Sequence, residues 1–515
     1  MLFNSYLFIF IFLPCTLLLF FYVAKYSHQW ALGILFLASL IFYGWWNYQY
    51  AFILLSSVAI NFFIAKCILN SGVAKKKFLY LGVIFNLSLL SYYKYMDFFV
   101  ENINYLTHAN LSSLNIVLPL GISFFTFTQI AFLVDCYRGL VKQFRLLHYG
   151  LFVTYFPHLV AGPIIHHKEV MPQFDKNRTF HFNYRNFLLG TSIFAIGLFK
   201  KTVLADYLGA LANPIFDGYL PHISTLDAWV AALSYTFEIY FDFSGYSDMA
   251  IGLSLLIGVK LPVNFYSPYK SVDIIEFWRR WNMTLSRFLR DYLYIPLGGN
   301  RNGFCRRYLN LIITMVLGGL WHGASWTFVL WGFLHGFYLT INHAWRALKK
   351  YLNIQSNNGF LFNFFSGMIT FLAVVIAWVI FRAPNFLVAR EILEAMFGQV
   401  FMLPNFWHSE AVIKIFLQNF YNAFTSESSL LGWIVTHTSF ILIVVSMAII
   451  WLLPNSYQFF RKYSPAFLPY QLQYLTVSKG LLWKPRLVWN YFIVLALVIG
   501  IIHIQASSIF LYFRF

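Results

Sequence analysis

The first candidate for chemistry in this sequence is a histidine at position 322. It stands in the run Gly-Gly-Leu-Trp-His-Gly, residues 318–323, between two apolar segments, and small residues let a backbone approach a substrate closely. An imidazole titrates near neutral pH, so a buried and well-oriented histidine can act as a general base on a hydroxyl group. A lone histidine in apolar surroundings is more often a packing residue, so spacing alone favours packing over catalysis at His322.

Two other histidines also lie in apolar surroundings. His335 follows His322 by 13 residues, which is about 220° around a continuous helix at about 100° per residue. The two rings are therefore expected to face different sides and not to act as a pair. His158, between Pro157 and Pro163, resembles a helix break that lines a cavity, but it could equally be structural.

A second candidate site lies in residues 241–248, which read Phe-Asp-Phe-Ser-Gly-Tyr-Ser-Asp. Asp242 and Asp248 stand here between apolar segments, where an ionised side chain is costly unless it is paired or hydrated. Gly245 predicts a broken helix whose freed backbone lines a cavity. The cluster is therefore a candidate for substrate binding, with ion pairs to nearby arginines as the structural alternative.

Residues 274–290 contain four arginines, Arg279, Arg280, Arg287 and Arg290. A continuous α-helix would gather them on one face and the Trp, Phe and Leu side chains on the other. Such a helix lies in the membrane interface or dips into it rather than spanning the membrane. Guanidinium groups bind phosphate bidentately, so this face is a candidate for holding a nucleotide-linked donor such as coenzyme A, or an acidic carrier protein. Attraction to lipid headgroups explains the same face equally well.

The composition shows what must position these residues. Hydrophobic residues make up 60% of the 515 positions and charged residues 10%, whereas a soluble domain has about 25% charged residues. The net charge of +18 comes from basic residues that gather at the ends of apolar segments, for example at 75–77 and 306–307, as cytoplasmic loops do. These features exclude a water-soluble fold and favour membrane topology over nucleic-acid binding.

Apolar runs of about 20 residues recur along the whole chain and predict membrane spans. The first, residues 2–24, lacks a basic region before it and is expected to be retained. The predicted spans are 4–24, 30–46, 50–69, 78–95, 114–134, 147–165, 187–204, 226–241, 246–259, 309–321, 324–342, 362–382, 431–453 and 488–510. Several are short for an upright crossing, so we expect about 11 to 13 transmembrane helices with one or two re-entrant pieces.

We expect a single membrane domain over residues 1–515, because the longest polar stretches are themselves rich in Phe and Trp. No internal repeat is visible, which counts against an inverted-repeat transporter. Four cysteines lie far apart without a Cys-x-x-Cys pair, so they predict neither a disulfide framework nor a zinc site.

Several motifs together resemble the membrane-bound O-acyltransferase family, and within it the membrane subunits of bacterial alginate O-acetyltransferases. The resemblance runs from end to end, with the motif-bearing core at about residues 115–345. The motifs that carry it are Leu118–Phe125, Asp135–Gly139, Phe156–Pro163, Tyr240–Met249, Phe277–Trp281, Leu289–Asn300 and Gly318–Gly323. The family implies an all-α, multi-pass bundle in the bacterial inner membrane with a funnel through it. It also implies a catalytic histidine deep inside, and the motif match places that histidine on His322.

The resemblance also implies an activity. The enzyme would take an acetyl group from a cytoplasmic thioester, acetyl-CoA or another acyl thioester, and hold no bound cofactor or metal. Periplasmic partner proteins would then complete the transfer to hydroxyl groups of an extracellular polysaccharide such as alginate, while the bilayer surrounds the chain and no nucleic acid is involved. His322 would deprotonate or hydrogen-bond the hydroxyl, Asn282 and nearby polar groups would position the reactants, and the arginine face would hold the donor.

The sequence departs from the family at two positions. Asn282 follows Arg280-Trp281 where bacterial relatives usually carry histidine, so this residue can hydrogen-bond but cannot titrate. Ser325 replaces an asparagine of the alginate enzymes. Four alternatives remain open at this point: O-acetylation of peptidoglycan, D-alanylation of teichoic acid, a polytopic transporter that binds cargo at Asp242 and Asp248, and a non-catalytic scaffold.

Overall fold

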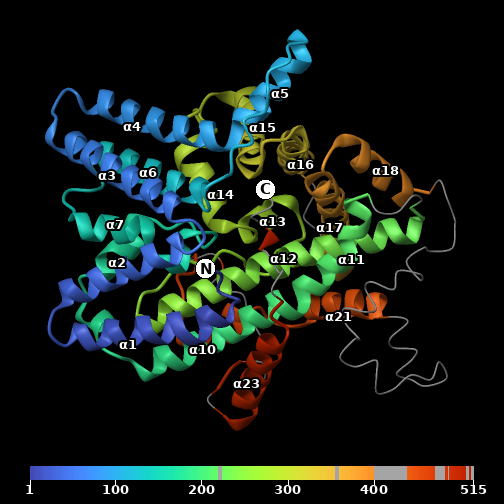
Figure 1. Cartoon of the computed structure of the whole chain (residues 1–515). Coiled ribbons are helices and arrows are strands. Elements are labelled where there is room, and N and C mark those ends of the chain that lie inside the picture. The colour runs from blue at the N-terminus through green and yellow to red at the C-terminus, as the bar shows by residue number, and fades with distance from the viewer. Residues whose placement is uncertain are drawn as a thin grey trace.

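The computed structural model describes residues 1–218, 223–353, 359–398, 438–469, 472, 482–484, 486–505 and 510–511. Helices dominate these residues (Figure 1), and their one extended pairing is an isolated bridge between Pro262 and Phe467. The expectation of an all-α protein is therefore confirmed.

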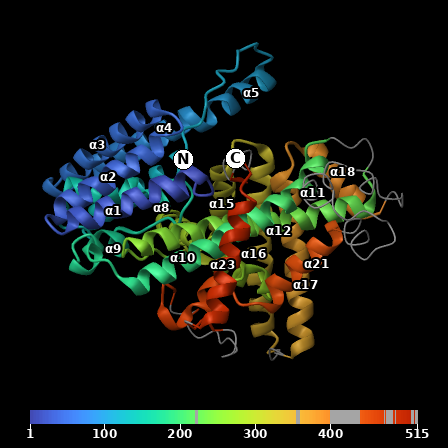
Figure 2. The same cartoon turned by 60° about the horizontal axis from the view of Figure 1, so that its bottom comes forward.

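The first third of the chain forms a group of neighbouring helices, seen at the left of Figure 1. Its helices are α1 (Leu13–Ala24), α2 (His28–Gly44), α3 (Tyr48–Asn70), α4 (Lys75–Leu90), α6 (Ile122–Tyr137) and α7 (Leu146–Thr154). Polar caps begin two of them, because the Ser27 and Asn47 side chains accept hydrogen bonds from the first-turn N–H groups of α2 and α3. Helix α5 (Met96–Thr107) projects from the body in both views (Figures 1 and 2).

The longest helix, α12 (Thr225–Leu256), runs through the core and is buried over nearly its whole length. It packs on α10 (Tyr184–Phe199), and glycines from the two helices face each other. A Cβ atom on Gly245 would lie only 2.8 Å from the carbonyl oxygen of Gly197. The prediction of separate segments at 226–241 and 246–259, with a break at Gly245, is therefore wrong, since this glycine serves close helix packing within one continuous helix.

The remaining helices of more than ten residues follow α10 in the chain. They are α11 (Asp206–Phe216), α15 (Gly303–His322), α16 (Trp326–Tyr351), α17 (Phe360–Arg382), α18 (Phe386–Met396), α21 (Thr438–Leu452) and α23 (Leu487–Ile502). Shorter helical segments lie between the longer helices along the chain: α8 (Phe156–Leu159), α9 (His167–Val170), α13 (Ile274–Arg280), α14 (Met283–Leu289), α22 (Ser456–Phe459), and the π-helical turns Ser91–Tyr95, Lys200–Ala205 and Arg290–Tyr294.

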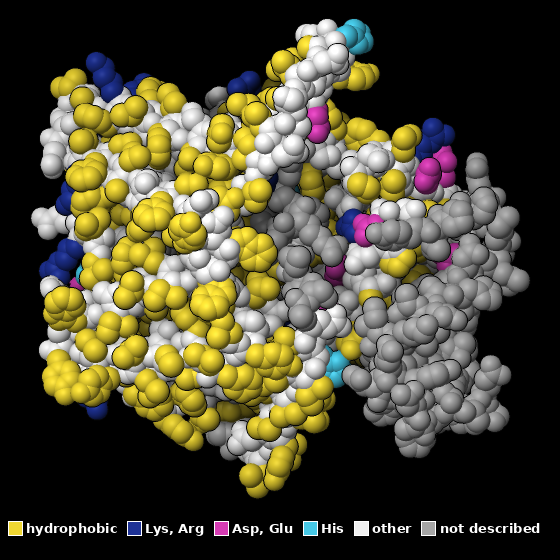
Figure 3. All heavy atoms as spheres, viewed as in Figure 1, with side chains coloured by type: hydrophobic (Ala, Val, Ile, Leu, Met, Phe, Trp, Pro, Cys, Tyr) yellow, Lys and Arg dark blue, Asp and Glu magenta, His cyan; other side chains and the backbone are white. Residues whose placement is uncertain are grey.

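Three helical stretches among the described residues are long and apolar enough to cross a membrane, namely Tyr48–Asn70, Tyr184–Phe216 and Phe360–Arg382. Five shorter apolar helices accompany them. Large apolar side chains are exposed over wide areas (Figure 3), as expected for a surface that faces lipid. The exact number of crossings stays a prediction.

The segment 274–290 differs from the predicted continuous helix. It consists of α13 and α14, separated at Trp281 and Asn282, and Asn282 has a left-handed backbone with φ 38°. Most of its apolar side chains are buried inside the protein rather than at an interface. The single amphipathic helix is therefore a wrong prediction.

Candidate active site

His322 is the last residue of α15 and is only 6% exposed. Aromatic rings surround its imidazole, with ring centroids of Trp331 and Phe381 both at 5.2 Å. The glycines before it serve helix packing, since a Cβ on Gly319 would lie 2.2 Å from the carbonyl oxygen of Phe328. The run at 318–323 is thus the tightly packed end of a helix, and the glycines bring α15 against α16.

The end of α15 is held by two residues that sequence reasoning missed. The Lys94 ammonium donates hydrogen bonds to the carbonyl oxygens of Trp321 (2.7 Å) and His322 (2.8 Å), and the Tyr95 hydroxyl donates to that of Leu320 (2.7 Å). The last carbonyls of a helix have no partner within the helix, and a cation there is favoured by the helix dipole. A lysine inside the apolar run 78–95 was the available signal, because a charge within a membrane segment needs a partner.

His322 and Asp242 line the same small cavity, whose volume of about 10 Å³ is room for about one water molecule. Its described lining residues are Ile239, Asp242, Phe243, Trp281, His322, Trp378, Phe381, Phe510 and Leu511. Apart from Asp242 and His322 these side chains are all apolar or aromatic. These two sequence candidates, 80 positions apart in the chain, are therefore brought together.

The carboxylate of Asp242 is paired with a lysine. Lys201 lies 2.6 Å from Asp242 Oδ1 and 2.7 Å from Asp206 Oδ1, and the backbone N–H of Leu511 donates to Asp242 Oδ2 at 3.0 Å. The predicted structural alternative, an ion pair between Asp242 and a nearby arginine, is wrong, because the partner is a lysine. A buried carboxylate needs a compensating charge, and the π-helical turn after α10 supplies it.

Asp248 does not line the cavity. Its Oδ2 atom accepts hydrogen bonds from Lys200 (2.7 Å) and from the Ser456 hydroxyl (2.6 Å). The two aspartates of α12 thus use neighbouring lysines, and only Asp242 reaches the cavity with His322. This arrangement favours a structural role for Asp248.

Asn282 lies at the break between α13 and α14 and is almost fully buried. Its side-chain Nδ2 has no hydrogen-bond partner among the residues that the structure describes. The neighbouring Trp281 lines the cavity. Backbone hydrogen bonds from Tyr266 to Arg280 and from Met283 to Asn264, both 2.9 Å, hold the break in place.

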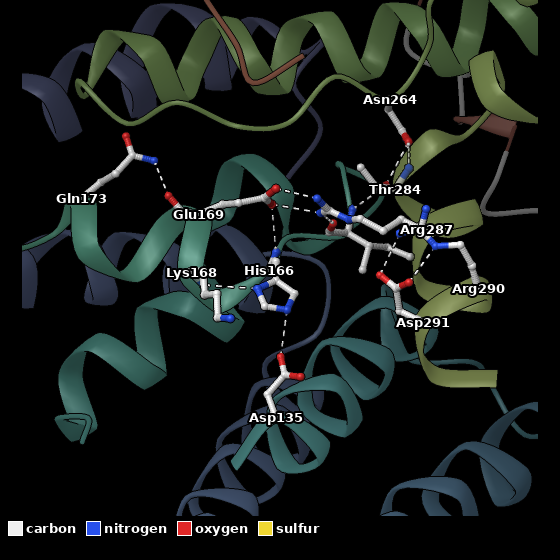
Figure 4. Close-up of polar contacts among 11 residues, drawn as sticks. Asp135, His166, Lys168, Glu169, Gln173, Asn264, Thr284, Arg287, Arg290 and Asp291 are labelled. Carbon is white, nitrogen blue, oxygen red and sulfur yellow. Dashed lines mark hydrogen bonds and ion pairs between the residues drawn. The ribbon is translucent and has the colours of Figure 1, made fainter. Parts of the chain in front are cut away.

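Three of the four candidate arginines are paired with carboxylates. Arg280 pairs with Glu276, Arg287 with Glu169, and Arg290 with Asp291, the last two shown in Figure 4. Arg279 is exposed, and no ion pair joins it to a described residue. The structure therefore does not form one free basic face, and Arg279 alone stays open towards an anionic donor.

The other two histidines have different surroundings from those expected. His335 and His322 lie on separate helices, and both rings pack against Trp331, with centroids at 4.7 and 5.2 Å. The expectation that they face unrelated sides is therefore wrong, although the shared neighbour does not make them a catalytic pair. His158 is buried, and its Nε2 lies 3.1 Å from the Phe152 carbonyl oxygen, which satisfies it structurally.

Comparison with known proteins identifies the family. The chain belongs to the membrane-bound O-acyltransferase family, whose profile matches residues 73–381. The chain is 44% identical over 427 residues to a peptidoglycan O-acetyltransferase of Helicobacter pylori, an alignment covering 77% of this chain and 80% of the relative.

Other relatives share the family. The probable alginate O-acetylase AlgI of Pseudomonas aeruginosa is 42% identical over 406 residues, covering 77% of this chain and 75% of the relative. A teichoic acid D-alanyltransferase of Streptococcus thermophilus is 32% identical over 251 residues, covering 45% of this chain and 59% of the relative. The expectation of a membrane-embedded O-acyltransferase enzyme is confirmed.

Proposed function

We propose that this acyltransferase passes an acetyl group from a cytoplasmic thioester, acetyl-CoA or another acyl thioester, across the inner membrane to the hydroxyl groups of an extracytoplasmic polysaccharide. The observation that carries the proposal is the cavity where a buried histidine at a fixed helix end meets a paired aspartate. Relatives named for O-acetylation align with 77% of the chain, and those named for D-alanylation with less than half. Acetyl transfer is therefore the better supported chemistry.

His322 acts as the general base in this proposal. Its imidazole takes the proton from an acceptor hydroxyl, the hydroxyl oxygen bonds to the thioester carbonyl carbon, and the carbon–sulfur bond breaks. The leaving thiolate then takes up the proton. The walls of Trp281, Trp378 and Phe381 keep water away from the thioester, which limits its hydrolysis.

Asn282 and Arg279 have supporting roles in the same proposal. The buried Asn282 amide is a hydrogen-bond donor for a reactant, because its Nδ2 is unpartnered within the described residues. Arg279 is the exposed cation for the donor's phosphate groups. Arg280, Arg287 and Arg290 contribute less to donor binding than the sequence predicts, because each already pairs with a carboxylate.

The test is the amount of ester-linked acetate on two polymers from the same cells, measured after mild alkaline hydrolysis. Cells carry wild-type protein, His322→Ala or His181→Ala at matched membrane abundance. His181 is an exposed histidine outside the cavity and serves as the control. We expect His322→Ala to lose the acetate and His181→Ala to retain it.

The two polymers separate the acceptors that the relatives suggest. Loss of acetate from purified cell-wall sacculi alone would assign peptidoglycan as the acceptor. Loss from secreted polysaccharide alone would assign an alginate-like polymer, together with periplasmic partner proteins that carry out the final transfer. Unchanged acetate on both polymers in His322→Ala would overturn the assignment of His322 as the base.

A further inference from the structure

We propose that Asp135, His166 and His167 bind one divalent transition-metal ion of the zinc type, at a site separate from the cavity at His322. Each residue offers one ligand atom, and these atoms lie within 4.8 Å of one another. Asp135 Oδ2 is 2.9 Å from His166 Nε2 and 3.1 Å from His167 Nδ1. The cysteine spacing predicted no metal site, but it did not test this histidine pair.

The burial of the cluster points to a ligand. Asp135 is 1% exposed and His167 is 8% exposed. Among the described residues, neither ring nitrogen of His167 makes a hydrogen bond of good geometry. Its Nδ1 lies 3.1 Å from Asp135 Oδ2. Buried polar groups are nearly always satisfied, and a cation between Asp135 Oδ2 and His167 Nδ1 would satisfy the His167 nitrogen.

The donor set fits a first-row ion such as Zn²⁺. Two imidazoles and a carboxylate are common ligands of such ions. Ligand atoms at ordinary zinc distances in a tetrahedral site lie about 3.4 Å apart. The observed 2.9 and 3.1 Å therefore need to open by only a few tenths of an ångström. The His166 side chain is 23% exposed, which gives an ion a route to the site.

One contact changes when an ion binds. His166 Nδ1 accepts a 3.3 Å hydrogen bond from the Lys168 N–H (Figure 4), so the ring proton lies on Nε2 in the ion-free form. Coordination through Nε2 moves that proton to Nδ1 and gives up this contact. The contact is long and therefore weak, whereas metal ligation is strong, so the contact does not oppose binding.

The position of the site assigns it a structural role. Asp135 lies in the last turn of α6, His166 precedes α9 and His167 begins it. The Tyr292 hydroxyl, on the turn after α14, donates to Asp135 Oδ2 at 2.9 Å. Glu169, two residues beyond the histidines, pairs with Arg287 of α14 (Figure 4). An ion here would stabilise the packing of these segments against α14 (Met283–Leu289) and the turn that follows it.

The test uses the full-length protein purified in detergent, stripped with EDTA and desalted. Zinc content is measured by elemental analysis after exposure to Zn²⁺, and Co²⁺ is used as a second probe whose visible spectrum reports coordination by nitrogen and oxygen. We expect about one ion per chain, a higher melting temperature with Zn²⁺, and loss of binding in His167→Ala. Tyr292→Phe should weaken binding about 10- to 100-fold, as loss of an outer hydrogen bond to a metal ligand does.

The control is His148→Ala, which removes the histidine of another histidine–aspartate pair, His148 with Asp175 at 3.0 Å. It should retain the ion. If His167→Ala fails to fold, the more exposed His166→Ala gives the same test. Absence of bound ion in the wild type, or full binding in both histidine variants, would overturn the proposal and leave Asp135 as a hydrogen-bond acceptor only.

Discussion

Lys94→Met is the substitution that tests how His322 is held. The Lys94 ammonium donates to the carbonyl oxygens of Trp321 and His322, the last two residues of α15. Methionine keeps the approximate length of the side chain and removes both hydrogen bonds. We therefore expect the end of α15, and the imidazole attached to it, to lose their fixed orientation while the rest of the fold remains.

The size of the effect follows from the two hydrogen bonds. A hydrogen bond from a charged donor contributes about 1.5–3 kcal/mol to stability. Keeping a partly buried ammonium out of water offsets part of this gain. A net loss of about 2 kcal/mol in the oriented state of His322 corresponds to about a 30-fold lower rate of acetyl transfer. Tyr95→Phe removes one neutral hydrogen bond, about 1 kcal/mol, and should lower the rate about fivefold.

The assay is the rate at which ester-linked acetate accumulates on the acceptor polymer, at matched membrane abundance, with the melting temperature measured in parallel. Lys66→Met is the matched control, because Lys66 also donates to a backbone carbonyl, that of Phe144 at 3.2 Å, far from α15 in the chain. Lys94→Arg should restore much of the rate, since a cation returns to the helix end. A wild-type rate in Lys94→Met, or an equal loss in Lys66→Met, would refute the reasoning.

Two further substitutions test the core around α12. Gly245→Ala should lower the melting temperature, because the added Cβ would lie 2.8 Å from the Gly197 carbonyl oxygen. Gly33→Ala is the control and should leave the melting temperature unchanged, because its Cβ would have no neighbouring atom within 4 Å. Equal melting temperatures for the two variants would contradict the packing argument. Lys201→Met should destabilise the protein by about 3–5 kcal/mol, because it removes the cation that pairs with the buried Asp242 carboxylate and with Asp206. Adding Asp242→Asn should recover much of that loss in the same unfolding assay, and no recovery would show that the pairing is not the cause.

Helices whose limits are set by local signals were predicted closely from the sequence. The span predicted at 50–69 is α3, Tyr48–Asn70, where Asn47 caps the first turn. The span predicted at 362–382 is α17, Phe360–Arg382. In both cases a mainly apolar run of about 20 residues lies between polar residues, so composition and helix form agree.

The prediction for α12 failed because the relevant partners are distant in sequence. Asp242, Gly245 and Asp248 suggested an interruption, since two carboxylates cannot stay in an apolar helix without compensation. Lys200 and Lys201, on the turn that follows α10, provide that compensation. The sequence around α12 does not indicate these ion pairs. They compensate the two carboxylates, so the helix can continue past Asp242 and Asp248.

At residues 274–290 the sequence predicted one continuous helix, whereas the structure has two, α13 and α14. The apolar pattern fits one helix, yet hydrogen bonds with the segment around Asn264 and Tyr266 stabilise a break at Asn282. One of the arginine ion pairs could have been predicted from the sequence, because Glu276 and Arg280 stand four residues apart on a helix. The pair of Glu169 with Arg287 spans 118 residues and could not be seen in the sequence.

The ion pair between Lys201 and Asp242 also limits which residues of the cavity can act as a base. Among its described lining residues only Asp242 and His322 can exchange a proton. Lys201 already compensates the Asp242 carboxylate, and the Asn282 amide cannot titrate. If a hydroxyl is the nucleophile, as proposed, His322 is therefore the best placed of the described lining residues to take its proton. The histidine at the capped end of α15 then carries the acid–base step without a second titrating histidine at position 282.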